Sequence, residues 1–159
     1  MIAESFRASS PGFQVKPDAR NGEQVYCNQV WRRIDPALSV LVPTWHDDPS
    51  GLLELLGKCA HVDKIEIILY DDGTGDADLT KKIQNGLDLF PGAGCLVTAE
   101  MNLGRSAGRN RLETLARSDW MIFLDADMIP DDQNFLTRYL QVIKQGSPPA
   151  LIVGGFSLR

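Results

Sequence analysis

Short apolar runs alternate with amphipathic segments along most of this 159-residue chain, and this alternation constrains the fold more than any other feature. A continuous apolar run is typical of a buried strand, whereas apolar residues every three or four positions indicate a helix. We predict strands at 38–42, 65–70, 95–99 and 120–124, and the start of another at 151–153. With helices between them, these strands predict an α/β fold with a mostly parallel sheet and helices on both faces.

Polar residues in front of the apolar faces predict where the helices begin. Asp48 precedes Pro49 and a leucine-rich face, and Ser106 precedes the third helix. Asp131 or Asp132 precedes the fourth helix. Each of these side chains can accept a hydrogen bond from a free amide of the first turn, so we predict that they are N-caps.

Residues 1–36 lack a stable period and are interrupted by Pro and Gly, so we predict an arm that lies on the domain, with Trp31 as its anchor. The regular pattern occupies 37–159. The cysteines Cys27, Cys59 and Cys95 are odd in number and far apart, which argues against a disulfide framework or a zinc site. We therefore expect reduced, structural thiols.

Composition excludes several classes of protein. The chain is 43% hydrophobic and 23% charged, which is typical of a globular domain, and its net charge of -5 argues against a nucleic-acid partner. No apolar run approaches the roughly 20 residues of a transmembrane segment, and the N-terminus lacks the apolar core of a secretory signal. We predict a cytoplasmic location.

The polar residues with chemical potential follow the predicted strands. In an open parallel sheet, ligands bind beyond the carboxyl ends of the strands. Four polar clusters occupy such positions, at 43–46, 71–73, 102–110 and 125–127. We therefore expect them to lie at one edge of the sheet.

Asp125 and Asp127 form the cluster with the clearest chemistry. Side chains alternate along a strand, so two carboxylates separated by Ala126 point to the same side. A hard cation such as Mg²⁺ or Mn²⁺ relieves their repulsion and completes its shell with phosphate oxygens and water. The pair therefore predicts a metal-dependent diphosphate site; the alternative is that both residues end a strand and hydrogen-bond the next turn.

Four ordered blocks of the chain, taken together, resemble glycosyltransferase family 2, whose members have a Rossmann-like GT-A fold that binds nucleotide-sugars. The blocks run from Ser39 to Trp45, from Ile67 to Asp76, from Asn102 to Asn110, and from Phe123 to Asp127, followed by Pro130. The resemblance implies that 37–159 is the nucleotide-sugar-binding portion of a GT-A domain. The chain departs from the family pattern at His46, Gly108 and Leu112, where Asn, Ala and Gly are usual.

The resemblance implies roles for the first two blocks in binding the base. Thr44 and Trp45 match the segment that lies against the base, for which an indole offers a stacking face. Asp72 matches the carboxylate that accepts a hydrogen bond from the base, such as N3–H of uracil. We expect Asp71 to support the loop and Asp76 to cap the next helix; the alternative for Trp45 is a place in the core.

The last two blocks imply how the diphosphate is held. Arg109, with Arg105 as a second candidate, matches a basic residue near a helix start that meets the diphosphate; the alternative for both is a solvated surface charge. Asp127 matches a ligand of Mn²⁺ or Mg²⁺, and Asp125 divides its contacts between the metal and the ribose.

The implied activity is inverting transfer of a sugar from a nucleoside-diphosphate sugar, predicted to be a UDP-sugar, to an unknown glycan, lipid or protein acceptor. In the family the general base lies well downstream of the Asp-x-Asp block. The residues after Asp127 contain only Asp131 and Asp132 as acids, both too close to that block. We therefore expect a fragment that lacks the acceptor half and its base, and that is inactive alone.

Three alternatives bear on location and function. Peripheral association with the inner face of a membrane stays open beside the cytoplasmic prediction. A non-catalytic nucleotide-sugar-binding protein is the first alternative function. A receiver-like phosphoacceptor module is a weaker alternative, because a whole strand and helix precede Asp71-Asp72 and too few residues follow Asp125 for its lysine-bearing strand.

Overall fold

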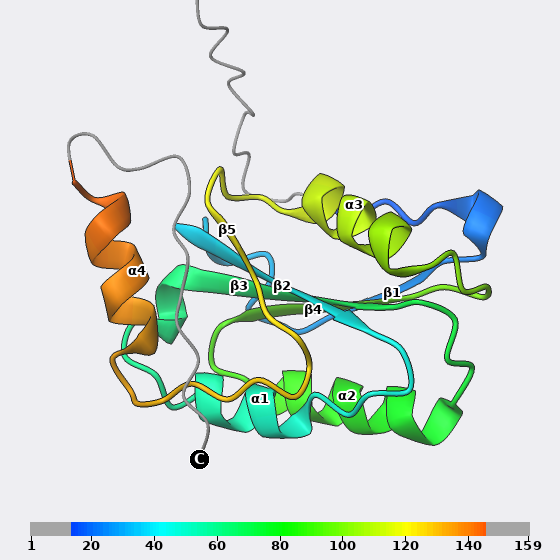
Figure 1. Cartoon of the computed structure of the whole chain (residues 1–159), viewed down its shortest axis with the longest axis horizontal. Coiled ribbons are helices and arrows are strands. Elements are labelled where there is room, and N and C mark those ends of the chain that lie inside the picture. The colour runs from blue at the N-terminus through cyan, green and yellow to red at the C-terminus, as the bar shows by residue number, and fades with distance from the viewer. Residues whose placement is uncertain (1–13, 146–159) are drawn as a thin grey trace, which may run out of the picture.

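Five strands form one sheet in the computed structural model, which describes residues 14–145 (Figure 1). The strands are β1 (Gln24–Cys27), β2 (Leu38–Thr44), β3 (Ile65–Asp71), β4 (Ala93–Thr98) and β5 (Met121–Phe123). Their order in the sheet is β1-β4-β3-β2-β5. β1 runs antiparallel to β4, and the other neighbours are parallel.

Helices cover both faces of this sheet. They are α1 (Ser50–Leu56), α2 (Ala77–Leu89), α3 (Arg105–Leu115) and α4 (Phe135–Ile143), with 3₁₀ turns η1 (Ala19–Asn21) and η2 (Val62–Lys64). α1 and α2 lie on one face, α3 lies on the other, and α4 stands at one end of the molecule (Figure 1). The predicted α/β fold with a mostly parallel sheet is confirmed.

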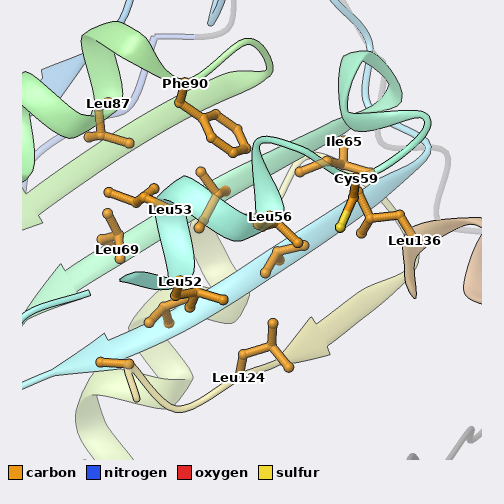
Figure 2. Packing of buried hydrophobic residues seen from close by; sticks show 14 of the residues in the cluster. Leu52, Leu53, Leu56, Cys59, Ile65, Leu69, Leu87, Phe90, Leu124 and Leu136 are labelled. Atoms are coloured by element: carbon orange, nitrogen blue, oxygen red, sulfur yellow. The ribbon is translucent and has the colours of Figure 1, made fainter. Parts of the chain in front are cut away.

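Two hydrophobic clusters follow from the alternation of side chains along the buried strands. On β3, Ile67 and Leu69 face α1 and α2, whereas Ile68 and Tyr70 face α3. Figure 2 shows the leucines of α1 between that helix and the sheet. Both faces of the central strands are therefore buried, which explains why their sequences are continuous apolar runs.

The N-terminal arm differs from its prediction because it contributes a strand. β1 pairs with β4 at the edge of the sheet, and its residues are exposed or only partly buried. A four-residue edge strand carries neither a long apolar run nor a strict alternation, so the sequence pattern gave no sign of it. The predicted anchor is confirmed, since Trp31 is 2% exposed in the cluster under α3.

Helix starts depart from the predicted caps by a residue or two. The Asp48 carboxylate accepts hydrogen bonds from the Ser50 amide and hydroxyl, but α1 begins only at Ser50, with Pro49 at the N-cap. Ser106 was wrongly predicted as a cap. α3 begins at Arg105 after Gly104, whose φ of 91° disfavours a side chain, so Ser106 lies inside the first turn.

At the fourth helix, Asn134 occupies the N-cap position of α4, while Asp132 accepts a hydrogen bond from the Asn134 amide just before it. The predicted caps Asp131 and Asp132 therefore both lie before the cap residue. The strand predicted at 151–153 lies outside the described residues. Within residues 14–145, no helix is long and apolar enough to span a bilayer, and the cytoplasmic location stays a prediction.

A buried ion pair joins four parts of the chain at the amino end of the parallel strands. The Glu66 side chain is fully buried and bonds Ser39 Oγ at 2.5 Å, the Arg117 amide at 2.7 Å and Arg117 Nε at 2.5 Å. The Arg117 guanidinium lies 4.0 Å from the ring centroid of Trp31. This network fixes β2, β3, the segment after α3 and the arm relative to one another.

Replacing Glu66 tests this network. In Glu66→Ala, Arg117 is left buried without its carboxylate, and breaking a buried pair in this way costs about 3–5 kcal/mol. We expect the free energy of unfolding, measured by urea denaturation, to fall by that order. Glu54→Ala removes the carboxylate of an exposed pair with Lys58 and is the control, expected to leave stability nearly unchanged. Equal effects in the two variants would contradict this role for Glu66.

Candidate functional site

The four predicted polar clusters do lie at one edge, where they line a cavity of about 370 Å³ at the carboxyl ends of the parallel strands. This volume lies within the usual range for small-molecule sites. Each cluster contributes to the lining, which includes Thr44, Trp45, Asp72, Arg105, Asp125 and Asp127. Arg109 is not part of this lining, but its guanidinium contacts the lining residue Asp125.

Asp72, the first residue after β3, organises the loop between β4 and α3. Its two carboxylate oxygens accept hydrogen bonds from the amides of Leu103 at 2.8 Å and Gly104 at 2.9 Å. The residue is only 7% exposed. Because a carboxylate oxygen can accept more than one hydrogen bond, Asp72 keeps acceptor capacity while it holds the loop.

Thr44 and Trp45 end β2 in opposite environments. Thr44 is 4% exposed, and its hydroxyl donates to the Tyr70 carbonyl at 3.2 Å. Trp45 is 54% exposed and meets the His46 ring edge-on at a centroid distance of 4.8 Å. Trp45 is thus not a core residue; its indole forms part of the cavity wall, with apolar surface available to a planar ligand.

Asp125 is held by two arginines from the first turns of α3. Its Oδ1 lies 3.3 Å from Arg105 Nη2 and 3.2 Å from Arg109 Nη2. The Arg109 guanidinium also lies 5.3 Å from the ring centroid of Phe123, and its Nε is buried without a hydrogen-bond partner among the described residues. The cavity therefore contains positive charge at the start of a helix beside an acidic pair.

The backbone around Asp125 and Asp127 differs from the predicted strand end. β5 stops at Phe123, and the Met128 amide donates to the Asp125 carbonyl at 3.0 Å, which closes a turn. Both carboxylates still line the cavity, but the turn, and not strand alternation, places them there. Asp127 is exposed and has no hydrogen bond or ion pair to any residue within 14–145.

The loop after β3 has the structural residues that were expected. Asp71 Oδ1 accepts from the Thr74 amide at 3.1 Å, and Asp76 Oδ1 accepts from the Leu79 amide at 3.0 Å, which caps α2. Gly73 has a φ of 79°, and a Cβ on it would approach the Asn102 nitrogen to 2.5 Å. A glycine is therefore required where this loop passes the one before α3.

Tyr70 and Gly108 are cavity residues that the sequence analysis did not identify as site residues. A Cβ on Gly108 would lie 3.3 Å from the Tyr70 ring, so the absence of a side chain in α3 makes room for the phenol. The signal was present in the sequence, because Gly108 departs from the alanine that is usual in the family. Only the structure shows what occupies the space.

Residues of the arm hold Tyr70 and α3 from behind the cavity. Asn21 Nδ2 donates to the Tyr70 hydroxyl at 3.1 Å. Glu23, whose side chain is 1% exposed, accepts from Arg111 Nη2 of α3 at 2.7 Å. Burial and the nearby Glu23 charge raise the pKa of Tyr70 to about 12. The arm therefore buttresses two elements that form the cavity wall.

Asp72 and Asp127 allow a matched test of the loop contacts. Asp72→Asn replaces one acceptor oxygen with an amide that faces backbone N–H groups, and an unsatisfied buried group costs about 1–3 kcal/mol. We expect the free energy of unfolding from urea denaturation to fall by that amount. Asp127→Asn makes the same chemical change at an exposed residue that has no hydrogen-bond partner within residues 14–145, and it should leave the free energy of unfolding unchanged. A similar loss of stability in both variants would contradict the role of Asp72 in holding the loop.

The pKa of Tyr70 predicts a loss of stability in alkali. The pKa of Tyr70 is about 12 in the folded state and 10.0 ordinarily, so folding favours the protonated phenol. The stability that the protonated phenol contributes is fully present below pH 10.0 and is lost as pH rises toward 12. We expect the urea midpoint to fall over this range, and to fall less steeply in Tyr70→Phe, which has no phenol to titrate. Identical pH dependence in the two proteins would contradict it.

Comparison with known proteins identifies relatives of this fold and sequence. A curated N-acetylglucosaminyltransferase of Rhizobium leguminosarum bv. phaseoli is 24% identical over 97 residues, which are 59% of this chain and 22% of that protein. The mannosyltransferase PcManGT from Pyrobaculum calidifontis, solved in complex with GDP-Man and Mn²⁺, superposes with a TM-score of 0.61 at 19% identity. The match covers 71% of this chain and 34% of that structure.

A second solved structure, S. aureus TarS 1–349 in complex with UDP, gives a TM-score of 0.53 at 24% identity and covers 67% of this chain and 31% of that one. At these identities the structures show a shared GT-A fold. The chain spans about a fifth of the curated relative and about a third of the solved structures. The model of Glycosyl transferase family 2 matches residues 39–156, most of the sequence, and this chain belongs to that family.

Proposed function

We propose that this chain is the donor-binding part of an inverting glycosyltransferase that holds a nucleoside-diphosphate sugar, specifically a UDP-sugar, with Mn²⁺ or Mg²⁺. One observation carries the proposal: an exposed indole, a buried carboxylate with spare acceptor capacity, and an acidic pair beside two arginines all converge on one cavity. These are the groups that a base, a sugar and a diphosphate require.

The base end of the cavity lies at Trp45 and Asp72. A uracil ring stacked on the exposed indole gains apolar contact, and its N3–H has an acceptor in the carboxylate of Asp72. Guanine also offers N–H donors to a carboxylate, whereas adenine offers only its amino group. The Asp72 carboxylate therefore favours uracil or guanine over adenine, and the choice of uracil rests on the family resemblance.

The residues at the other end fit a divalent cation. Asp127 offers oxygen ligands that are not engaged by residues 14–145, and Asp125 lies in the same cavity. Within those residues no group of three His, Cys, Asp or Glu side chains forms a complete metal site. This matches an ion that takes its remaining ligands from phosphate oxygens and water; when bound, it neutralises charge on the diphosphate leaving group.

The arginines act on the same anion from the protein side. Arg105 lines the cavity and is 72% exposed, so it can turn from Asp125 toward a phosphate oxygen. Arg109 is less exposed and contacts both Asp125 and Phe123, so it orients Asp125 toward the ribose. The start of α3 adds backbone amides and a favourable dipole.

The acceptor and the general base belong to the proposal for the whole protein. A carboxylate from beyond the described residues takes the proton of the acceptor hydroxyl, and the acceptor is a glycan, lipid or protein. The relatives are consistent with this donor chemistry, since PcManGT was solved with GDP-Man and Mn²⁺ and TarS with UDP. A non-catalytic nucleotide-sugar-binding protein uses the same cavity and is distinguished by the absence of turnover in the full-length protein.

Thermal unfolding with nucleotides tests the donor site. We expect UDP with Mn²⁺ to raise the melting temperature, because a ligand at about 100 times its Kd stabilises the native state by about 2.7 kcal/mol. Asp127→Asn should remove most of the metal-dependent part of the shift. GDP and ADP, each with and without Mn²⁺, measure selectivity for the base.

The matched control is Asp63→Asn, which removes the same charge from an exposed residue of η2, immediately before β3 and so at the opposite edge of the sheet. Its UDP and Mn²⁺ response should equal that of the wild type. A UDP-induced rise in melting temperature that is equal with and without Mn²⁺, or one that persists in Asp127→Asn, would contradict the proposed metal site. No shift with any nucleotide would overturn the proposed function.

A further inference from the structure

Two of the three cysteines are neighbours in space although they lie 68 positions apart in the sequence. All three are free thiols in this structure, and β1 places Cys27 directly opposite Cys95 of β4 in the antiparallel ladder. Their sulfur atoms are 2.9 Å apart, and both side chains lie on the face covered by α3. The sequence pattern predicts no strand at Gln24–Cys27, so it gives no reason to pair Cys27 with Cys95.

The ladder geometry suits a covalent link. The Asn28 amide donates to the Gly94 carbonyl at 3.0 Å, and Asn28 and Gly94 continue the register of the four β1–β4 pairs. Hydrogen-bonded and non-hydrogen-bonded pairs alternate in an antiparallel ladder, so Cys27 and Cys95 form a non-hydrogen-bonded pair, with Cα atoms about 4.5 Å apart. This lies at the short end of the range of about 4.4–6.8 Å that disulfides span.

Asn28 fixes the backbone beside this pair. Its side-chain nitrogen donates to the carbonyls of Leu87 at 2.9 Å and Gly92 at 3.0 Å, and its oxygen accepts from the Gly94 amide at 3.1 Å. Asn28 is 7% exposed. The end of β1 is thus held against the start of β4, which keeps Cys27 and Cys95 opposite each other.

The two thiols differ in solvent exposure and in the direction in which their pKa is shifted. Cys27 lies on the edge strand and is partly exposed, whereas Cys95 is fully buried. The hydrogen bond with Cys95 and the nearby charges of Arg117 and Arg32 lower the pKa of Cys27, while the pKa of Cys95 is raised. Cys27 is therefore the attacking thiolate and Cys95 the resolving thiol.

We propose that Cys27 and Cys95 are an oxidative modification site, which a small-molecule disulfide such as glutathione disulfide converts into an intramolecular disulfide. The Cys27 thiolate attacks one sulfur of glutathione disulfide and releases one glutathione. Cys95 then loses its proton, attacks the Cys27 sulfur and releases the second glutathione. Two electrons and two protons pass from the protein to the reagent, and excess glutathione reverses the reaction.

The bond ties the arm to the sheet at the end of β1 farther from the cavity, because Cys27 pairs with Cys95 near the start of β4. β1 is preceded by Asn21 and Glu23, whose side chains hold Tyr70 and Arg111. With the disulfide formed, β1 stays paired with β4, and Asn21 and Glu23 stay in contact with Tyr70 and Arg111. In the reduced protein β1 is a short edge strand that can open locally. The inference stands on the ladder and does not depend on the proposed function.

The test uses the reduced protein in glutathione redox buffers, followed by acid quenching, alkylation and peptide mass spectrometry. We expect the free thiols to fall from three to one, with Cys59 remaining and the Cys27 and Cys95 peptides joined. The melting temperature should rise on the order of 10 °C on oxidation and return with reductant. Hydrogen exchange of β1 should slow in the oxidised form.

Variants separate the pair from the third cysteine. Cys59→Ser should oxidise like the wild type, and Cys27→Ala, a change at a partly exposed residue, should abolish both the joined peptides and the rise in melting temperature. Three alkylated thiols after equilibration with glutathione disulfide would overturn the proposal. So would a bond that involves Cys59, or a mixed disulfide of Cys27 with glutathione that persists in the wild-type protein.

Discussion

The carboxylate of Asp72 is the contact on which the site depends. Asp72 directly follows β3, and by accepting hydrogen bonds from the amides of Leu103 and Gly104 it fixes where the chain enters α3. The helix then begins at Arg105 without a side-chain cap. Because the position of the first turn of α3 is set in this way, Arg105 and Arg109 of this helix reach Asp125, which follows β5. One buried acid thus joins the proposed base end of the cavity to its proposed diphosphate end.

The charges of the cavity bear on how an acidic protein would hold the proposed anionic ligand. The chain carries a net charge of -5, yet both arginines near the cavity are engaged by Asp125. This pairing holds both arginines, and within residues 14–145 it leaves Asp127 as the carboxylate available for the proposed cation. In the proposed site, a cation and a diphosphate would satisfy each other's charge, so that binding of both together costs less than binding of either alone.

The central architecture could be predicted from sequence because β2, β3 and β4 are buried on both faces and read as continuous apolar runs. The same rule hides β1, which is an edge strand with mixed exposure. The residues of the cavity were also predictable as strand-end clusters. Their contacts were not, because Asp125 and Asp127 reach the cavity through a turn, and the Tyr70 ring packs closely against the backbone of α3 at Gly108.

Stability and binding are placed at opposite ends of the same strands. At the amino end, Glu66 is fully buried, and its ion pair with Arg117 faces no solvent that a ligand could displace. At the carboxyl end, the side chains of Arg105, Arg109 and Asp125 are partly exposed, and the amides of Leu103 and Gly104 are held by the side chain of Asp72. A parallel sheet makes this division possible because all its strands end at the same edge. The arm contacts both ends of the strands, since Trp31 packs against Arg117 of the buried pair while Asn21 donates to Tyr70 at the cavity. Detachment of β1 from the sheet would therefore disturb the proposed binding edge without removing any residue that lines it.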